Sequence, residues 1–484
     1  MTSAQRPDSG RTQRLATWAA TLEYSDLDAG SVSQLKASVL DAFGCALYGF
    51  GLPSTQVVLR AMAGARVSAG GARVWGTPSF YEPMVAAMVN GAAIQAFELD
   101  DVHGEAMLHG SSTMLPAVLA IADLRPGLSG RDMLTALGAG WEVGVRINRC
   151  MGPHVLARGW HAPTVFGTIA AAAAAARALH LEPERYTHAL MLGVLQAGGL
   201  LAVQYEGMAK RLYAGCAAKA GVLSTLLAEQ GFTAPADALE HPVGGFIATF
   251  ARGDPVFPDT LDRELGQDLA AATIAFKLHA NCAAMHPAID AFAELCAREP
   301  RLRPDTIERI VVELTEHGYK HVGWPYVPNN ATTAQFSDAL LADRVLLALV
   351  DRIEVVHAPH LDTEVLAARH RCCLSVCLKD GTVLHHARET ARGRPDDPVA
   401  FSVVENKFFS LTEEIMTRPR SHALADRIAV LEGLADVSVL SSELQAGPAP
   451  AEDVSSRGSR RVIEGTNPNR AGPGPVANLN LRKR

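Results

Sequence analysis

The chain has 484 residues, of which 48% are hydrophobic and 20% charged, and 44 Lys and Arg residues against 51 Asp and Glu residues give a formal net charge of −7. This acidic balance argues against nucleic acid as the main partner, because a phosphate-binding surface needs an excess of basic side chains. The apolar content is that of a folded globular chain and not of a disordered one.

Helical periodicity dominates the chain from Arg14 to about residue 268. Apolar residues recur three and four positions apart in segments such as SVSQLKASVLDAFGCALYGF and GRDMLTALGAGWEVGVRI, with Ser, Asp and Gly where helices start and stop. The pattern predicts an all-α domain over residues 14–268, preceded by a disordered polar arm at residues 1–13.

The pattern changes near residue 270. RIVVELTEHGY is typical of a strand, and CCLSVCLKDGTVLHHARET predicts two strands joined by an Asp380–Gly381 turn, with helical stretches (AAMHPAIDAFAELCAR and AQFSDALLADRVLLALV) between. We predict a smaller α+β lid domain over residues 269–399, helices at 400–445 that pack back onto the first domain, and a disordered tail at 447–484. The predicted fold class is therefore mainly α.

Metal centres and membrane spans are not expected. The eight cysteines are too sparse for a disulfide framework, and they lack the close pairs of zinc and iron–sulfur sites. The N-terminus lacks the apolar core of a secretion signal, and the apolar runs 162–176 and 189–203 are too rich in Ala and Gly to span a membrane. We expect a cytoplasmic protein.

The densest polar cluster lies in FELDDVHGEAMLHGSSTMLP, at the end of a predicted helix. It contains Glu98, Asp100, Asp101, His103, Glu105 and His109. Carboxylates beside histidines shift one another's pKa, as acid–base chemistry requires, and a solvated helix end is the structural alternative. Two metal-dependent alternatives fit poorly, because the HExxH spacing is absent and Gly104 stands where an Asp-rich diphosphate motif needs its third acid.

Basic and imidazole side chains recur in later segments. His161 precedes an Ala-rich helix with Pro163 in its first turn, where backbone N–H groups attract anions; a structural histidine is the alternative. The adjacent Lys210 and Arg211 suit the binding of a carboxylate, or form an ordinary surface pair.

The α+β segment adds two further windows. They supply Lys277, His279, Cys282 and His286, and then His317, Tyr319 and His321. Cys282 with one of these histidines would make a nucleophilic pair, but no G-x-S-x-G elbow supports acyl transfer. No G-x-G-x-x-G follows a strand and no G-x-x-x-x-G-K-[ST] is present, so no nucleotide cofactor is expected.

Six segments, in chain order, resemble the MmgE/PrpD family, which includes 2-methylcitrate dehydratase, cis-aconitate decarboxylase and iminodisuccinate epimerase. They are ELDDVHGEAMLHGSSTMLPAVLA, GWHAPTVFGTIAAAAAAARALHL, MAKRLYAGCAAKAG, FKLHANCAAMHPAIDA, YVPNNATTAQFS and LKDGTVLHH. The resemblance covers residues 14–445 and implies a helical domain, a smaller α+β lid, an active site between them, a homodimer, and neither a cofactor nor an iron–sulfur cluster.

The resemblance also assigns site residues, motif by motif. They are Asp100 or Asp101, His109, His161, Lys210, Lys277 and Tyr319. This chain departs from the family pattern at three places: His109–Gly110 replaces a common His-Pro, Val102 replaces a hydroxyl residue, and Cys282 stands where the decarboxylase branch has a histidine. The last two departures argue against cis-aconitate decarboxylation and leave dehydration and epimerisation open.

We therefore expect a cofactor-independent dehydratase acting on a citrate-like polycarboxylate such as 2-methylcitrate. The expected substrate-binding residues are Lys210, Arg211, Lys277, Cys282 and His286. His161 or His109 would remove a proton next to a carboxylate, and a protonated His109, His161 or Tyr319 would help hydroxide leave as water. The alternatives are an epimerase of a small dicarboxylate of the iminodisuccinate kind, a cis-aconitate-type decarboxylase, and a non-catalytic helical dimer that binds a ligand.

Overall fold

A computed structural model describes residues 10–152, 154–323, 349–363, 365 and 368–444. The predicted tail, the YVPNNATTAQFS segment and nearly all of the predicted helix AQFSDALLADRVLLALV lie outside the described residues. The first helix, α1 (Arg11–Thr21), begins inside the segment predicted as a disordered arm. It is held there by Arg11, which pairs with Asp262 at 2.6 Å, and by the Thr12 hydroxyl, which donates to Glu240 at 2.6 Å.

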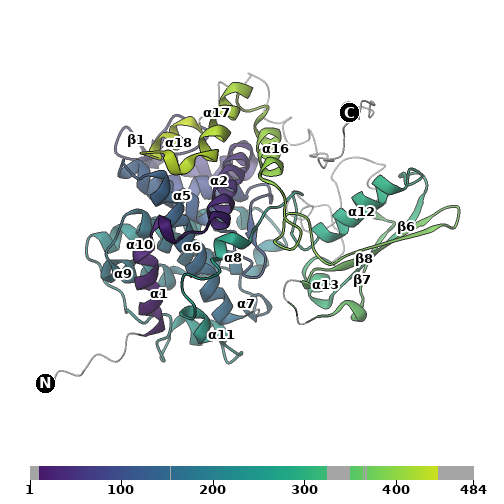
Figure 1. Cartoon of the computed structure of the whole chain (residues 1–484), viewed down its shortest axis with the longest axis horizontal. Helices are drawn as coiled ribbons and strands as arrows, with labels where there is room; N and C mark the ends of the chain where they lie inside the picture. The colour runs from purple at the N-terminus through teal and green to yellow at the C-terminus, as the bar shows by residue number, and fades with distance from the viewer. Residues whose placement is uncertain (1–9, 153, 324–348, 364, 366–367, 445–484) are drawn as a thin grey trace.

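A body of packed helices forms most of the molecule (Figure 1), which confirms the mainly α prediction. Its long helices are α2 (Ala29–Phe50), α4 (Pro83–Gln95), α5 (Gly110–Leu124), α6 (Gly130–Met151), α8 (Ala162–Ala178), α9 (Pro183–Gln196) and α10 (Ala209–Glu229). Helix α8 is buried along almost its whole length, and its alanines let neighbours approach closely. At Gly221 on α10, a Cβ would lie only 2.6 Å from the backbone of Ala171.

Shorter elements complete the body. The helices are α3 (Pro53–Ala61), α7 (His154–Ala157) and α11 (Phe246–Ala251), with 3-10 turns at Tyr24–Asp26, Ala63–Ala65, Leu201–Gln204, Pro258–Leu261 and Ala270–Thr273. Five two-residue strands also occur: β1 (Arg66–Val67), β2 (Ala72–Arg73), β3 (Phe80–Tyr81), β4 (Val102–His103) and β5 (Ile274–Ala275). Four of these strands fall inside the segment expected to be all-α, where pairs this short leave no alternating pattern long enough to detect.

The second half carries a four-stranded sheet with strand order β7-β6-β8-β9. Its strands are β6 (Ile307–Leu314), β7 (Ile353–His357), β8 (Cys372–Leu378) and β9 (Val383–Arg388), flanked by α12 (His286–Arg298), α13 (Glu316–Val322) and a 3-10 turn at Pro359–Leu361. Strand β6 runs parallel to β7 and antiparallel to β8. The β8–β9 hairpin turns at Asp380–Gly381, where Gly381 has a φ of 86° that favours glycine.

This sheet has an apolar core of its own. Side chains of Ile310 and Val376 on the sheet pack with Ala291 and Leu295 on α12. Alternate residues of β8 are buried, so Cys372 faces the core while Cys373 and Cys377 are only half-buried. In Figure 1 the sheet and α12 project from one side of the helical body.

The last helices of the described chain return to the helical body. They are α16 (Phe401–Thr412), α17 (Arg418–Ala429) and α18 (Ser438–Glu443), with a 3-10 turn at Leu431–Gly433. Helix α16 packs along α2, and Phe408 and Leu411 belong to the same apolar core as Phe43. Residues that follow the sheet in sequence therefore help to support the first half of the chain.

No single helix of the described chain is both long and apolar enough to cross a membrane. Among the described helices, α2 and α3 are long and apolar enough when taken as a pair. The pair is bent by 78° at the break between the two helices.

Candidate active site

A cavity lies where the helical body meets the segments around the sheet. From the body it is lined by Glu98, Val102, Gly104, Met107, His109, Leu156, His161, Pro163, Gln204 and Lys210. The rest of the lining comes from Lys277, Cys282, Ala283, Ala284, His321, Arg369, His370 and Arg394. Five residues predicted from the sequence (His109, His161, Lys210, Lys277 and Cys282) thus share one cavity.

Glu98 is the centre of the charged part of the cavity. Its carboxylate accepts hydrogen bonds from Lys210 Nζ at 2.6 and 2.9 Å, from Lys277 Nζ at 3.1 Å and from the Arg211 guanidinium. Burial alone would raise the pKa of Glu98, but these cations hold it well below its usual value. Burial lowers the pKa of Lys210 to about 8, although Glu98 opposes that shift.

A strained backbone and a short strand pair bring these residues together. Glu98 has a φ of 57°, and Met107, also on the cavity wall, has a φ of 51°. Left-handed backbone at residues other than glycine costs free energy and is concentrated at functional sites. Strand β4 follows Glu98 and pairs with β5, which ends two residues before Lys277. This pairing places the acidic loop beside Lys277.

His109 is oriented by an aspartate behind it. The Nδ1 atom of His109 lies 3.0 Å from an oxygen of Asp100, which is fully buried. Burial alone would raise the pKa of Asp100, but the imidazole charge and hydrogen bond, together with Lys277, lower it. A carboxylate in this position stabilises a protonated imidazole. Asp101 instead accepts hydrogen bonds from the Ser111 N–H at 3.2 Å and hydroxyl at 2.5 Å, which fixes the loop that carries His109.

His161 is fully buried at the N-terminus of α8. Its Nδ1 atom lies 2.6 Å from the Thr164 hydroxyl, while Nε2 has no hydrogen-bond partner among the described residues. Burial lowers the pKa of His161 well below its usual value, and the charges of Lys210 and His109 add to this effect. His161 is therefore a neutral imidazole at neutral pH.

Arginine and histidine side chains on the opposite wall were not assigned to the site from the sequence. Arg369 donates to the backbone carbonyl of Gly104, so it links the segment before β8 to the acidic loop. Arg394 also approaches Gly104, and its buried Nε has no hydrogen-bond partner among the described residues. Arg369, His370 and Arg394 belong to no motif, so only the three-dimensional arrangement reveals them.

Five predicted site residues do not line the cavity. Asp100, Asp101 and Arg211 lie behind it, bonded to His109, Ser111 and Glu98 respectively. His286 is buried against His279, with ring centroids 5.0 Å apart. Tyr319 is 39% exposed, because it lies two positions from both His317 and His321 on α13 and so occupies the other face of that helix. The structure therefore does not bring Tyr319 or His286 to the cavity.

Two groups of possible metal ligands occur among the described residues. The first is His317, His321 and His370, of which the last two line the cavity, and the second is Glu313, His360 and Cys373 at the sheet. The sequence analysis predicted no metal site, because neither group shows a spacing that is recognisable along the chain.

Comparison with protein families accounts for most of the chain. The model of the MmgE/PrpD N-terminal domain matches residues 13–258, and that of the MmgE/PrpD C-terminal domain matches residues 279–338 and 327–432. The chain belongs to the MmgE/PrpD family. The resemblance inferred from six short segments is confirmed.

Curated members of this family align with nearly the whole chain. The cis-aconitate decarboxylase-like protein oryM of Aspergillus oryzae is 32% identical over 473 residues, covering 90% of this chain and 97% of the relative. The cis-aconitate decarboxylase of Aspergillus terreus is 31% identical over 468 residues, covering 89% and 95%. That of Mus musculus is 29% identical over 475 residues, covering 92% and 95%.

Proposed function

We propose that this protein is a cofactor-independent lyase that decarboxylates an unsaturated polycarboxylate of the cis-aconitate kind. The observation that carries the proposal is the cavity in which Lys210 and Lys277 share the Glu98 carboxylate beside His109 and His161. The relatives named above favour decarboxylation over the dehydration expected from the sequence. Val102 and Cys282, which argued against decarboxylation, line the cavity, and His109 and His161 still supply imidazoles there although Cys282 replaces a histidine of the decarboxylase branch.

The charge of the cavity matches a multiply anionic ligand. Lys210, Lys277, Arg369 and Arg394 are cationic, whereas Glu98 is the one carboxylate among the described residues of the lining. The excess of positive charge would be neutralised by a substrate with two or three carboxylates. A charge-assisted hydrogen bond to such a group contributes about 1.5–3 kcal/mol.

The chemistry follows from this arrangement. When the bond to the departing carboxylate breaks, its electron pair forms a new double bond, and the original double bond shifts its electrons to the neighbouring carbon. That carbon takes one proton from the protein, so one proton is consumed for each CO₂ released. Lys210 and Lys277 would stabilise the negative charge that develops on the remaining carboxylates. His109, whose Nδ1 atom lies 3.0 Å from the buried Asp100 carboxylate, is the proton donor in this scheme.

Turnover in D₂O tests the proposal directly. Purified protein with cis-aconitate should release CO₂ and give a product that carries one deuterium, measured by mass spectrometry and NMR. Loss of water from 2-methylcitrate without CO₂ would identify a dehydratase instead. Inversion of a dicarboxylate such as iminodisuccinate, with no loss of mass, would identify an epimerase. Binding without turnover of any of these acids would identify the non-catalytic alternative.

Dehydration of 2-methylcitrate is the second candidate, and the state of His161 favours it. A neutral imidazole with an unpartnered Nε2 is suited to accept a proton from carbon next to a carboxylate. In that reaction a protonated His109 would help hydroxide to leave as water. The two reactions thus depend on different histidines, and comparison of His109→Asn with His161→Asn on both substrates separates them.

We also propose that the protein is a homodimer and that it is located in the cytoplasm. Light scattering after gel filtration tests the homodimer.

A further inference from the structure

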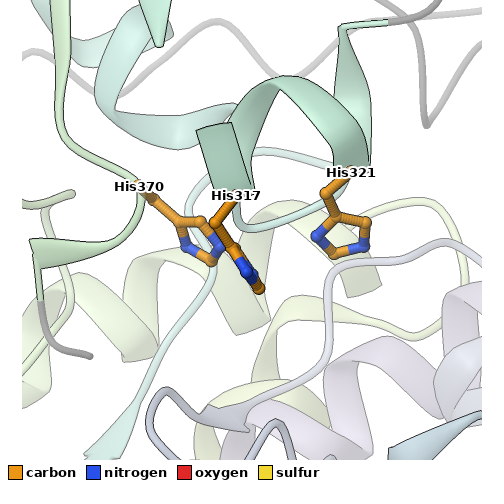
Figure 2. Close-up of side chains that lie close together, drawn as sticks. All are labelled: His317, His321 and His370. Carbon is orange, nitrogen blue, oxygen red and sulfur yellow. The ribbon is translucent and has the colours of Figure 1, made fainter. Parts of the chain in front are cut away.

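Three histidines, His317, His321 and His370, lie close together (Figure 2). His317 and His321 are four residues apart on α13 and so lie on one face of that helix, while His370 comes from the segment just before β8. One ring nitrogen of each histidine lies within 4.8 Å of those of the other two. The ring centroids are 5.4–6.3 Å apart.

The hydrogen bonding of these rings calls for an explanation. His370 is only 7% exposed, and neither of its ring nitrogens has a hydrogen-bond partner among the described residues. The Nε2 atom of His317 is also buried without a hydrogen-bond partner among the described residues. Nearly all buried polar groups in proteins are satisfied, and exceptions mark a bound water, an ion or a functional role. Three converging imidazoles are a donor set that suits a transition-metal ion.

We propose that His317, His321 and His370 bind one divalent transition-metal ion, with Zn²⁺ as the expected ion. Zinc accepts neutral imidazole nitrogens at about 2.0–2.1 Å in tetrahedral geometry. The ligand nitrogens lie within 4.8 Å of one another, so small rotations of the rings would bring all three to bonding distance from one ion. Such an ion would join α13 to the segment before β8 and would so fix two parts of the cavity wall relative to each other. The decarboxylation proposed above does not require it.

The fourth coordination position faces the cavity. His321 and His370 line it together with Cys282, whose Sγ atom lies 3.9 Å from Nε2 of His321. Burial raises the pKa of the Cys282 thiol, so without an ion this side chain is a neutral thiol. A coordinated thiol loses its proton, and thus Cys282 or a water molecule would complete the site.

Nearby charges set the strength of binding. Burial, together with the charges of Arg369 and Arg394, lowers the pKa of His370 well below its usual value. The same cations repel a divalent ion, whereas Glu98 and Glu105 act in the opposite direction on His321 and Arg369 respectively. We therefore expect weaker binding than at a closed structural zinc site with four protein ligands.

Metal titration of the full-length protein tests this site. After removal of metals with a chelator, Zn²⁺ is added, and calorimetry and the melting temperature are measured; Co²⁺ absorption reports the geometry. One ion per chain should bind and raise the melting temperature, because a ligand of the native state stabilises it. His317→Ala and His370→Ala should each abolish this effect, whereas His422→Ala, an exposed histidine on α17, should leave it unchanged.

Two outcomes would overturn the proposal. The first is the absence of stoichiometric binding to a wild-type protein that folds normally by circular dichroism. The second is binding that survives His370→Ala but is lost in His360→Ala, since this would assign the ion to Glu313, His360 and Cys373 instead. Neither outcome depends on enzymatic turnover, so both are distinct from failure of the proposed lyase activity.

Discussion

Lys407 donates a hydrogen bond to the backbone carbonyl of Lys277 at 3.0 Å, although the two residues are 130 positions apart. The same ammonium group donates to the carbonyl of Leu99 at 2.5 Å and pairs with Asp41 at 2.5 Å. All of these groups are buried. Helix α16 therefore fixes the backbone on which Glu98 and Lys277 are placed, and Lys407 is a positioning residue of the cavity.

Replacing Lys407 with Met should lower both stability and activity. The substitution leaves the Asp41 carboxylate buried without its cation, and breaking one partner of a buried ion pair costs about 3–5 kcal/mol. Urea unfolding would measure this loss, and kcat should fall because Lys277 is no longer fixed. The matched control is Lys36→Met, which breaks a half-exposed pair with Glu432 and should cost about 1 kcal/mol or less. Equal costs for the two variants would contradict the assignment.

Asp100→Asn should lower kcat by about 10²- to 10⁴-fold while the fold is kept. Asparagine retains the shape of the side chain, but it cannot stabilise the positive charge of a protonated His109. Steady-state kinetics would measure the fall in kcat, and circular dichroism would show whether the fold is kept. Asp123→Asn serves as the control, because the Asp123 carboxylate accepts a hydrogen bond from the Arg73 N–H and does not line the cavity. A change in KM alone, with kcat unchanged, would show that the Asp100–His109 pair takes no part in proton transfer.

The pH dependence of kcat/KM should show a loss of activity above about pH 8, the lowered pKa of Lys210. As the pH rises through that value, the ammonium loses its proton and no longer attracts a substrate carboxylate, which stays ionised throughout. The charged form is thus present below the pKa and lost above it. Lys210→Arg keeps its charge to much higher pH, so its profile should stay flat in this range. If kcat/KM of Lys210→Arg falls above pH 8 as it does in the wild type, the titrating group is not Lys210.

Local patterns explain which features were predictable. The helical body and five cavity residues were found because periodicity and short motifs such as the His109 and His161 windows are visible along the chain. Arg369, Arg394 and Lys407 were missed because they act through contacts with residues far away in sequence. Lys407 lies in an ordinary amphipathic helix, where a lysine predicts a solvated face. The predicted domain boundaries at 268 and 399 remain predictions.

The direction in which a side chain points from its helix also could not be predicted from the sequence. Tyr319 was assigned by motif, yet α13 turns it away from His317 and His321 and leaves it 39% exposed. Arg211 was predicted to bind substrate together with Lys210, but its guanidinium reaches Glu98 and the carbonyl of Gln95 behind the cavity wall. Adjacent residues on a helix point about 100° apart, so a basic pair does not act as one unit.

Gly110→Ala should destabilise the protein by about 1–3 kcal/mol, because an added methyl group overfills a packed core. A Cβ at this first residue of α5 would lie 2.4 Å from the ring of Trp141, which is fully buried. This contact is the structural reason for a glycine after His109, where the family commonly has proline. Gly64→Ala is the control, since nothing lies within 4 Å of its added methyl group. Equal melting temperatures for the two variants would contradict the close packing of Gly110 against Trp141.

Arg394→Gln should weaken binding of a tricarboxylate more than that of a dicarboxylate. Its buried Nε lacks a partner among the described residues, and Arg394 lines the same cavity as Lys210 and Lys277, so a third carboxylate could pair with its guanidinium. Loss of one such contact, about 1.5–3 kcal/mol, corresponds to a roughly 10- to 100-fold rise in Ki for propane-1,2,3-tricarboxylate. Glutarate, with two carboxylates, should change far less, and Arg298→Gln, an exposed arginine, should change neither. A parallel rise for both acids would show that Arg394 acts only through the general charge of the cavity.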